Sequence, residues 1–208
     1  MTPRHASDGE TRREAYPHDA RGRAGRLARA CALALVAVAA AATHAVPAAR
    51  DHEIRAAMLV NFTRFVEWPT HAWSDSAAPF LIGVVGRAPL GAALDLAAGG
   101  KRVGARPIVV RRWTDAGAAR DGAQRCQMLY FADDAGPEAA SLLRELDGTP
   151  VLVIGDAPGF ASRGGTVGFF VEARHLGFEI NRRAAERGGL RVSSKLLELA
   201  RLVETRRP

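Results

Sequence analysis

Cysteine is scarce in this sequence. Its 208 residues include only Cys31 and Cys126. Cys31 lies in an apolar segment near the N-terminus that we expect to be removed, so Cys126 would be alone and no disulfide could form within the mature chain. Cys126 comes just before the apolar run 128–131. A small buried side chain is the main expectation there, and a reactive or intermolecular thiol is the alternative.

Motifs for covalent catalysis are also missing. The sequence contains no Gly-x-Ser-x-Gly turn. Ser193-Ser194-Lys195 does not have the Ser-x-x-Lys spacing of the β-lactamases, because position 192 is valine. A serine that caps a helix, followed by a solvated lysine, explains this segment better. We therefore expect a protein that is not an enzyme.

Signals for metals and cofactors are equally weak. His52, His71 and His175 lie far apart, without the paired spacing of a metal site. The glycines of 83–91 have the spacing Gly-x-x-Gly-x-x-x-x-Gly, which differs from that of a dinucleotide loop. A tight turn between a strand and a helix accounts for them. We expect neither a metal nor a cofactor.

The charge pattern does not favour nucleic acid. The chain has 29 basic and 22 acidic residues. Residues 1–45 contain seven of the basic and four of the acidic ones, so residues 46–208 contain 22 basic and 18 acidic residues. The resulting net charge of +4 is scattered, and no basic stripe is interleaved with aromatic residues. This distribution argues against a nucleic-acid partner.

The segment from Arg26 to Ala45 has the three parts of a secretory signal peptide. Arg26 and Arg29 precede thirteen apolar residues, and Thr43 and Ala45 provide a small-residue exit. A membrane anchor is the alternative, but a spanning helix needs about 20 apolar residues. We expect residues 1–45 to be a signal peptide with a long polar n-region, cut after Ala45 or, as second choice, after Ala48. Residues 46–208 would then form a single exported domain.

Alternating helix and strand patterns follow this segment. Apolar residues at spacings of three and four predict a helix over 51–68, with Asp51 as N-cap and Pro69 as stop. Short apolar runs predict buried strands, and Pro or Gly bounds the predicted helices. The strands are expected at 80–85, 107–111, 128–132 and 151–155, the helices at 89–98 and 137–146, and a loop or short helix at 114–124. This order predicts a three-layer α/β/α fold with a mixed, mostly parallel sheet.

The pattern changes after residue 155. Strands at 166–171 and 176–180, separated by four residues, predict a C-terminal hairpin. A short helix is expected at 181–187. Ser193 or Ser194 would then cap a final helix that carries Leu196, Ala200 and Val203 on one face.

Several segments together resemble the YfiR-type family of bacterial periplasmic proteins. Each segment alone is unspecific, but all keep the order of the family and cover nearly all of residues 46–208. They are Asn61-Phe-Thr-Arg-Phe-Val-Glu-Trp-Pro69, Phe80-Leu-Ile-Gly-Val-Val-Gly86, Arg106-Pro-Ile108, Cys126-Gln-Met-Leu-Tyr-Phe131, Pro150-Val-Leu-Val-Ile-Gly-Asp156, Gly159-Phe-Ala161, Gly164-Gly-Thr-Val-Gly-Phe169, Phe178-Glu-Ile-Asn181 and Ser193-Ser-Lys-Leu-Leu-Glu-Leu-Ala-Arg201.

The resemblance implies a non-enzymatic regulator in the periplasm. Its expected partner is the periplasmic part of an inner-membrane signalling protein, a diguanylate cyclase, which it would restrain by protein–protein contact. A homodimer is compatible with this role. The best-known members have internal disulfides that connect folding with redox state. With Cys126 alone, such redox sensing is not expected here.

Six residues are the candidates for partner binding. Asp156 and Phe160 follow a predicted strand, at the edge where ligands and partners of open α/β sheets usually bind. An ordinary Asx turn is the alternative for Asp156. Arg64, Glu67 and Trp68 end the first predicted helix, where Trp68 is either a partner anchor or a core residue. Glu172 in the hairpin is either a contact for a cationic partner or a solvated side chain.

Two further functions compete with the regulator hypothesis. One is a periplasmic ligand-binding or accessory module of another membrane sensor or transport system. The other is a periplasmic hydrolase, which the missing catalytic motifs make the weakest of the three. Neighbouring genes would distinguish the first two, since a cyclase gene favours the regulator.

Overall fold

The computed structural model describes residues 45–87 and 90–205. Apart from Ala45 and Val46, these residues belong to one compact unit, Pro47–Pro208. The signal peptide expected at 1–45 lies outside the described residues except for Ala45. In the part of the chain that is described, no helix is long and apolar enough to cross a membrane.

An eight-stranded sheet forms the centre of the unit, in the order β10-β8-β7-β6-β5-β2-β4-β3. Five adjacent strands in the middle of the sheet run parallel to one another, in the order β7-β6-β5-β2-β4. Two strands run antiparallel to a neighbour: β8 to β7, and β3 to β4. The sheet is therefore mixed and mostly parallel, as predicted. Its strands are β2 (Phe80–Val85), β3 (Arg102–Val103), β4 (Arg106–Trp113), β5 (Met128–Phe131), β6 (Leu152–Gly155), β7 (Val167–Glu172), β8 (His175–Ile180) and β10 (Arg201–Leu202).

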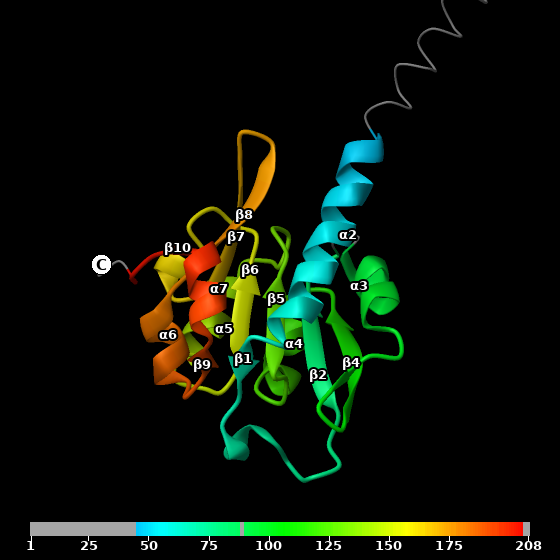
Figure 1. Ribbon diagram of the computed structural model, residues 1–208, viewed down its shortest axis with the longest axis vertical. Helices are drawn as coiled ribbons and strands as arrows, with labels where there is room; N and C mark the ends of the chain where they lie inside the picture. The colour runs from blue at the N-terminus through cyan, green and yellow to red at the C-terminus, as the bar shows by residue number, and fades with distance from the viewer. Residues whose placement is uncertain (1–44, 88–89, 206–208) are drawn as a thin grey trace, which may run out of the picture. The chain divides into compact units, whose positions relative to one another are not determined.

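Helices cover both faces of the sheet, which gives the expected α/β class. Buried residues of α2, α3, α6 and α7 share one hydrophobic cluster, and those of α4 and α5 share the other. Strand β5 shows the division, because Met128 and Tyr130 belong to the first cluster and Leu129 and Phe131 to the second. The helices are α2 (Ala45–Phe62), α3 (Leu90–Ala98), α4 (Ala116–Ala123), α5 (Ala139–Glu145), α6 (Arg182–Arg187) and α7 (Ser194–Leu199). Figure 1 shows their arrangement.

Cys126 lies inside the second cluster, with 2% of its surface exposed. Burial raises the pKa of its thiol to about 12. The thiol is therefore neutral at physiological pH, and only the thiolate is an efficient nucleophile. These properties confirm the prediction of a small buried side chain at this position.

The first helix differs from its prediction at both ends. Asp51 lies within α2 and is not its N-cap, and the helix ends at Phe62 rather than at Trp68. After a turn, β1 (Val66–Glu67) pairs antiparallel with β9 (Arg191–Val192) in a separate two-stranded sheet. This pairing joins segments more than 120 residues apart, so the local periodicity of the sequence could not reveal it.

The final helix is also shorter than expected. Ser193 caps α7, since its side chain accepts a hydrogen bond from the Leu196 backbone N–H. The helix ends at Leu199, and Ala200 is extended instead of continuing the predicted apolar face. The next residues form β10 parallel to β8, and the Val203 N–H donates to the Ile180 carbonyl at 3.0 Å. Completion of the sheet therefore overrides helix propensity here.

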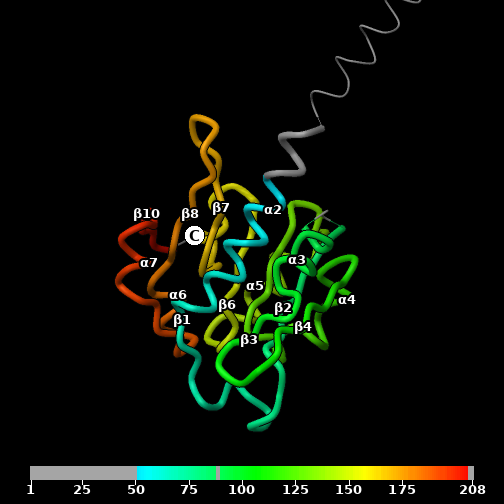
Figure 2. The backbone as a smooth tube through the Cα atoms, turned by 45° about the vertical axis from the view of Figure 1, so that its right-hand side comes forward, coloured from blue at the N-terminus to red at the C-terminus, as the bar shows by residue number. Residues whose placement is uncertain are grey.

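The C-terminal hairpin is confirmed. Strands β7 and β8 pair along their whole length, and Ala173 and Arg174 form the two-residue turn with φ of 48° and 66°. Only Val167 and Gly168 of β7 pair with β6. The rest of the hairpin therefore extends beyond the carboxyl end of β6, as Figure 2 shows.

Candidate functional site

The six candidate residues lie at opposite edges of the sheet. Asp156 and Phe160 follow the carboxyl end of β6, and Glu172 ends β7, which extends from the same edge. Trp68 contacts Gln127, which precedes β5 at the amino edge. Nearby, Glu67 belongs to β1 and Arg64 precedes that strand. The structure therefore divides the six residues between two edges and does not bring them into one common site.

An ion pair inside the carboxyl edge joins α2 to the sheet. The Arg55 Nε donates to Asp156 Oδ1 at 3.2 Å, and their side chains are only 13% and 15% exposed. The hydroxyl of Tyr130, from β5, donates to the other carboxylate oxygen. Asp156 thus connects a helix and two strands, and it is more than an Asx turn.

Burial dominates the electrostatics of this cluster. It raises the pKa of the Asp156 carboxyl above its usual range, while the Tyr130 hydrogen bond and the Arg55 charge act in the opposite direction. Burial and the nearby Asp156 charge also raise the pKa of the Tyr130 hydroxyl. The tyrosine therefore stays protonated and can keep donating to the carboxylate.

Phe160 anchors the loop that follows Asp156. Its side chain is 5% exposed, and its ring lies 5.6 Å from that of Phe131. A Cβ atom added to Gly155 or Gly165 would overlap the Phe160 ring, so these glycines leave the space that it occupies. Phe160 is thus placed to hold the loop, whereas its neighbours Pro158 and Gly159 are exposed.

The hairpin adds further exposed side chains to the carboxyl edge. Val171 is 58% exposed, and Glu172 forms an ion pair of 2.7 Å with Arg201 of β10. The Arg201 guanidinium also lies 4.1 Å from the centre of the Phe170 ring. Exposed apolar and charged groups therefore share this hairpin.

The amino edge is organised differently. The Trp68 indole donates to the Gln127 carbonyl at 2.8 Å, and its ring meets Phe80 edge-on with centroids 4.9 Å apart. These contacts place Trp68 among the core residues rather than as a free partner anchor, although part of its surface remains accessible. Arg64 and Glu67 are exposed, and Glu67 lies 3.7 Å from Arg191.

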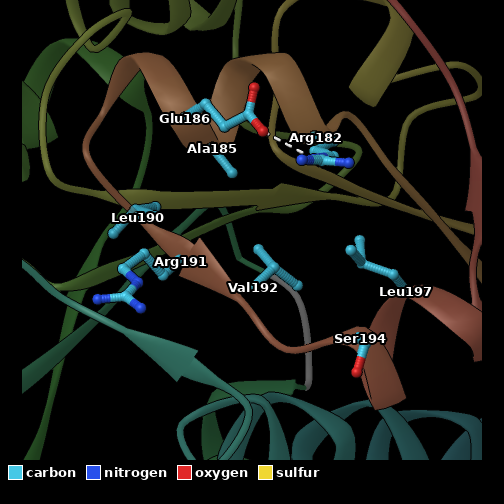
Figure 3. Close-up of a pocket in the computed structure, with 8 residues that line it drawn as sticks. All are labelled: Arg182, Ala185, Glu186, Leu190, Arg191, Val192, Ser194 and Leu197. Carbon is cyan, nitrogen blue, oxygen red and sulfur yellow. Dashed lines mark hydrogen bonds and ion pairs between the residues drawn. The ribbon is translucent and has the colours of Figure 1, made fainter.

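A cleft of about 390 Å³ opens between α6, β9 and α7, as Figure 3 shows. One side carries the Arg182–Glu186 ion pair of 2.7 Å, and Arg191 and Ser194 add polar groups. Arg191 also lines a smaller depression next to Arg64 and Glu67. Over the described residues, no three or more His, Cys, Asp or Glu side chains meet in a metal-binding cluster.

Sequence reasoning missed Arg55 and Tyr130. A signal was available for Arg55, because it lies on the helix face that includes the buried Ala56 and Leu59. An arginine on such a face needs a partner. The partner itself, 101 residues away, could not be inferred without the fold.

Comparison with a solved structure gives limited similarity. A conserved domain protein from Vibrio cholerae O1 biovar El Tor matches with a TM-score of 0.44 and 18% identity, over 59% of this chain and 54% of that one. The similarity thus spans about half of the solved chain. Among curated proteins, none matches the sequence.

The YfiR/HmsC-like family matches residues 52–201, which include most of α2 and all of the central sheet except the last residue of β10. The match covers well over half of the chain and agrees with the ordered sequence segments. The chain therefore belongs to the YfiR/HmsC-like family.

Proposed function

We propose that this chain restrains an inner-membrane diguanylate cyclase by protein–protein contact in the periplasm. The observation that carries the proposal is the family match over residues 52–201, because this family implies a periplasmic regulator of cyclic di-GMP signalling. The chain would act by binding and not by catalysis. An inhibitor of this kind must bind the inactive state of its partner more tightly than the active state.

The hairpin is the best candidate for the contact surface. It extends beyond the sheet and carries the exposed Val171 and Glu172, and Ile54 of α2, one residue before Arg55, is 48% exposed. Apolar side chains ringed by charge suit a protein partner better than a small polar molecule. The Arg55–Asp156 pair supports this edge from within, so we assign it a positioning role.

Substitutions that reverse or introduce a charge at each edge would test the proposal. We expect deletion of residues 46–208 to raise cellular cyclic di-GMP and biofilm, and the exported wild-type protein to restore both. Glu172→Arg and Val171→Asp should fail to restore them, because they place unfavourable charge in the contact. Glu198→Arg, at an exposed site on α7, is the matched control and should restore repression.

Glu67→Arg distinguishes the two edges. If it fails to restore repression while Glu172→Arg succeeds, the contact lies at the amino edge with Arg64. Unchanged cyclic di-GMP in the deletion strain, with the neighbouring cyclase expressed, would reject the regulator and favour the accessory module.

A further inference from the structure

A second cleft lies at the carboxyl edge, on the face of the sheet that α5 covers. It measures about 420 Å³ and opens between α5 with its preceding loop and the loop that follows β6. This volume falls within the usual range of about 300–1,000 Å³ for small-molecule sites. Ala157 lines the cleft, so it adjoins Asp156 along the chain.

Apolar groups form most of the lining. The buried Phe131, Leu143 and Phe160 belong to the second hydrophobic cluster, while Pro137 and Ala140 are exposed at the cleft. Carbon-rich walls open to water favour an occupant that brings apolar surface of its own.

Two arginines also belong to the lining, and both are exposed to water. Arg144 comes from α5 and Arg163 from the short 3-10 helix Ala161–Arg163. Among the described residues neither side chain forms an ion pair, and the Arg163 guanidinium donates to the Pro158 carbonyl. Asp133 is the one acidic residue in the lining.

The contrast with Arg120 is informative. Arg120 lies on α4 and forms ion pairs with two glutamates of the α5 segment, Glu138 and Glu145. Neither cleft arginine forms an ion pair of this kind with a described residue, although acidic residues are close in sequence. Guanidinium groups bind carboxylates with two parallel hydrogen bonds, so a ligand carboxylate would supply the missing partner.

We propose that this cleft binds a small amphipathic carboxylate. Its apolar part would lie against Phe131, Leu143 and Phe160, and its carboxylate would bind Arg144 and Arg163. The loop that holds Asp156 forms one wall of the cleft, so an occupant would also stabilise the segment that positions the Arg55 ion pair. This inference goes beyond the proposed function, because binding does not require a cyclase.

Titration calorimetry of the purified exported protein with sodium octanoate tests this directly. We expect saturable binding with a dissociation constant below about 1 mM. The matched alcohol, 1-octanol, should bind at least about tenfold more weakly because it lacks the charge. Absence of saturable binding, or equal binding of octanol, would overturn the proposal.

Variants locate the site. The double substitution Arg144→Ala/Arg163→Ala should weaken octanoate binding about tenfold or more, and Ala140→Phe should abolish it by filling the cleft. Arg125→Ala, at an exposed position just before β5, is the matched control and should bind as wild type. Circular dichroism checks that each variant is folded. Unchanged binding in both the double variant and Ala140→Phe would place octanoate elsewhere and reject the cleft.

Discussion

At the scale of single residues, the best-defined feature is the group formed by Arg55, Tyr130 and Asp156. All three side chains are largely buried. The Asp156 carboxylate accepts from Arg55 with one oxygen and from Tyr130 with the other. Breaking a buried pair is costly because one charge is left without compensation. Of the three, the sequence indicated only Asp156, and their meeting depends on the packing of α2 on the sheet.

The first prediction concerns removal of this carboxylate. Asp156→Ala should lower the free energy of unfolding by about 3 kcal/mol, because it leaves the Arg55 charge and the Tyr130 hydroxyl without a buried partner. The double variant Arg55→Ala/Asp156→Ala should lose less than the sum of the two single variants. Urea unfolding at neutral pH measures all three, and simple additivity would show that the pair is not coupled.

The second prediction uses the pH dependence of the same residue. The folded-state pKa of Asp156 is raised above its ordinary value of 3.8, so the folded protein binds this proton more tightly than the unfolded chain. The stability that this proton contributes is present below pH 3.8 and is lost as pH rises through the raised pKa. The free energy of unfolding of wild type relative to Asp156→Asn should therefore fall as pH increases above about 4. A difference that grows with pH would mean that the Arg55 charge outweighs burial.

At the scale of elements, the central strands and most helices could be predicted because their signals are local. Continuous apolar runs identified β2, β5 and β6, and the hairpin followed from the spacing of its strands. Four strands escaped prediction, since each has only two residues and is defined by its partner. They are β1, β3, β9 and β10. The predicted C-terminal ends of α2 and α7 were wrong because the short strands β1 and β10 follow these helices.

The third prediction concerns the helix cap that the sequence left open between two serines. The Ser193 hydroxyl accepts from Leu196 N–H at 3.3 Å, whereas Ser194 is an exposed first-turn residue. Ser193→Ala should lower the free energy of unfolding by about 1 kcal/mol, the usual contribution of such a cap. Ser194→Ala is the control and should change it by less than about 0.5 kcal/mol. Chemical denaturation compares the two, and a larger loss in the Ser194 variant would contradict the observed cap.

At the scale of the whole molecule, the order of strands determines which side chains meet. The parallel core places the segments after β5 and β6 at one edge, and the hairpin extends from that edge. Trp68 lies at the opposite edge because α2 runs back along the sheet. The two groups of candidate residues can therefore be tested as separate surfaces.

The fourth prediction concerns export of the chain. The arginine-flanked apolar run and the Thr43–Ala45 exit predict removal of residues 1–45, so that the mature protein begins at Val46 and keeps nearly all of α2. Intact-mass measurement on a periplasmic extract should give a species smaller than the 22.1 kDa chain. Recovery of the full-length chain from the membrane fraction would instead favour an anchor.

The sequence by itself determined the α/β class, the positions of the central strands and the burial of Cys126, because these depend on local apolar patterns. It also indicated the family through the order of its segments, which the family match confirms. Only the tertiary structure decided that Arg55 pairs with Asp156, that Phe160 anchors its loop, and that Trp68 lies at the other edge. These relations join residues far apart in the chain, and local periodicity carries no information about which distant segments pack together.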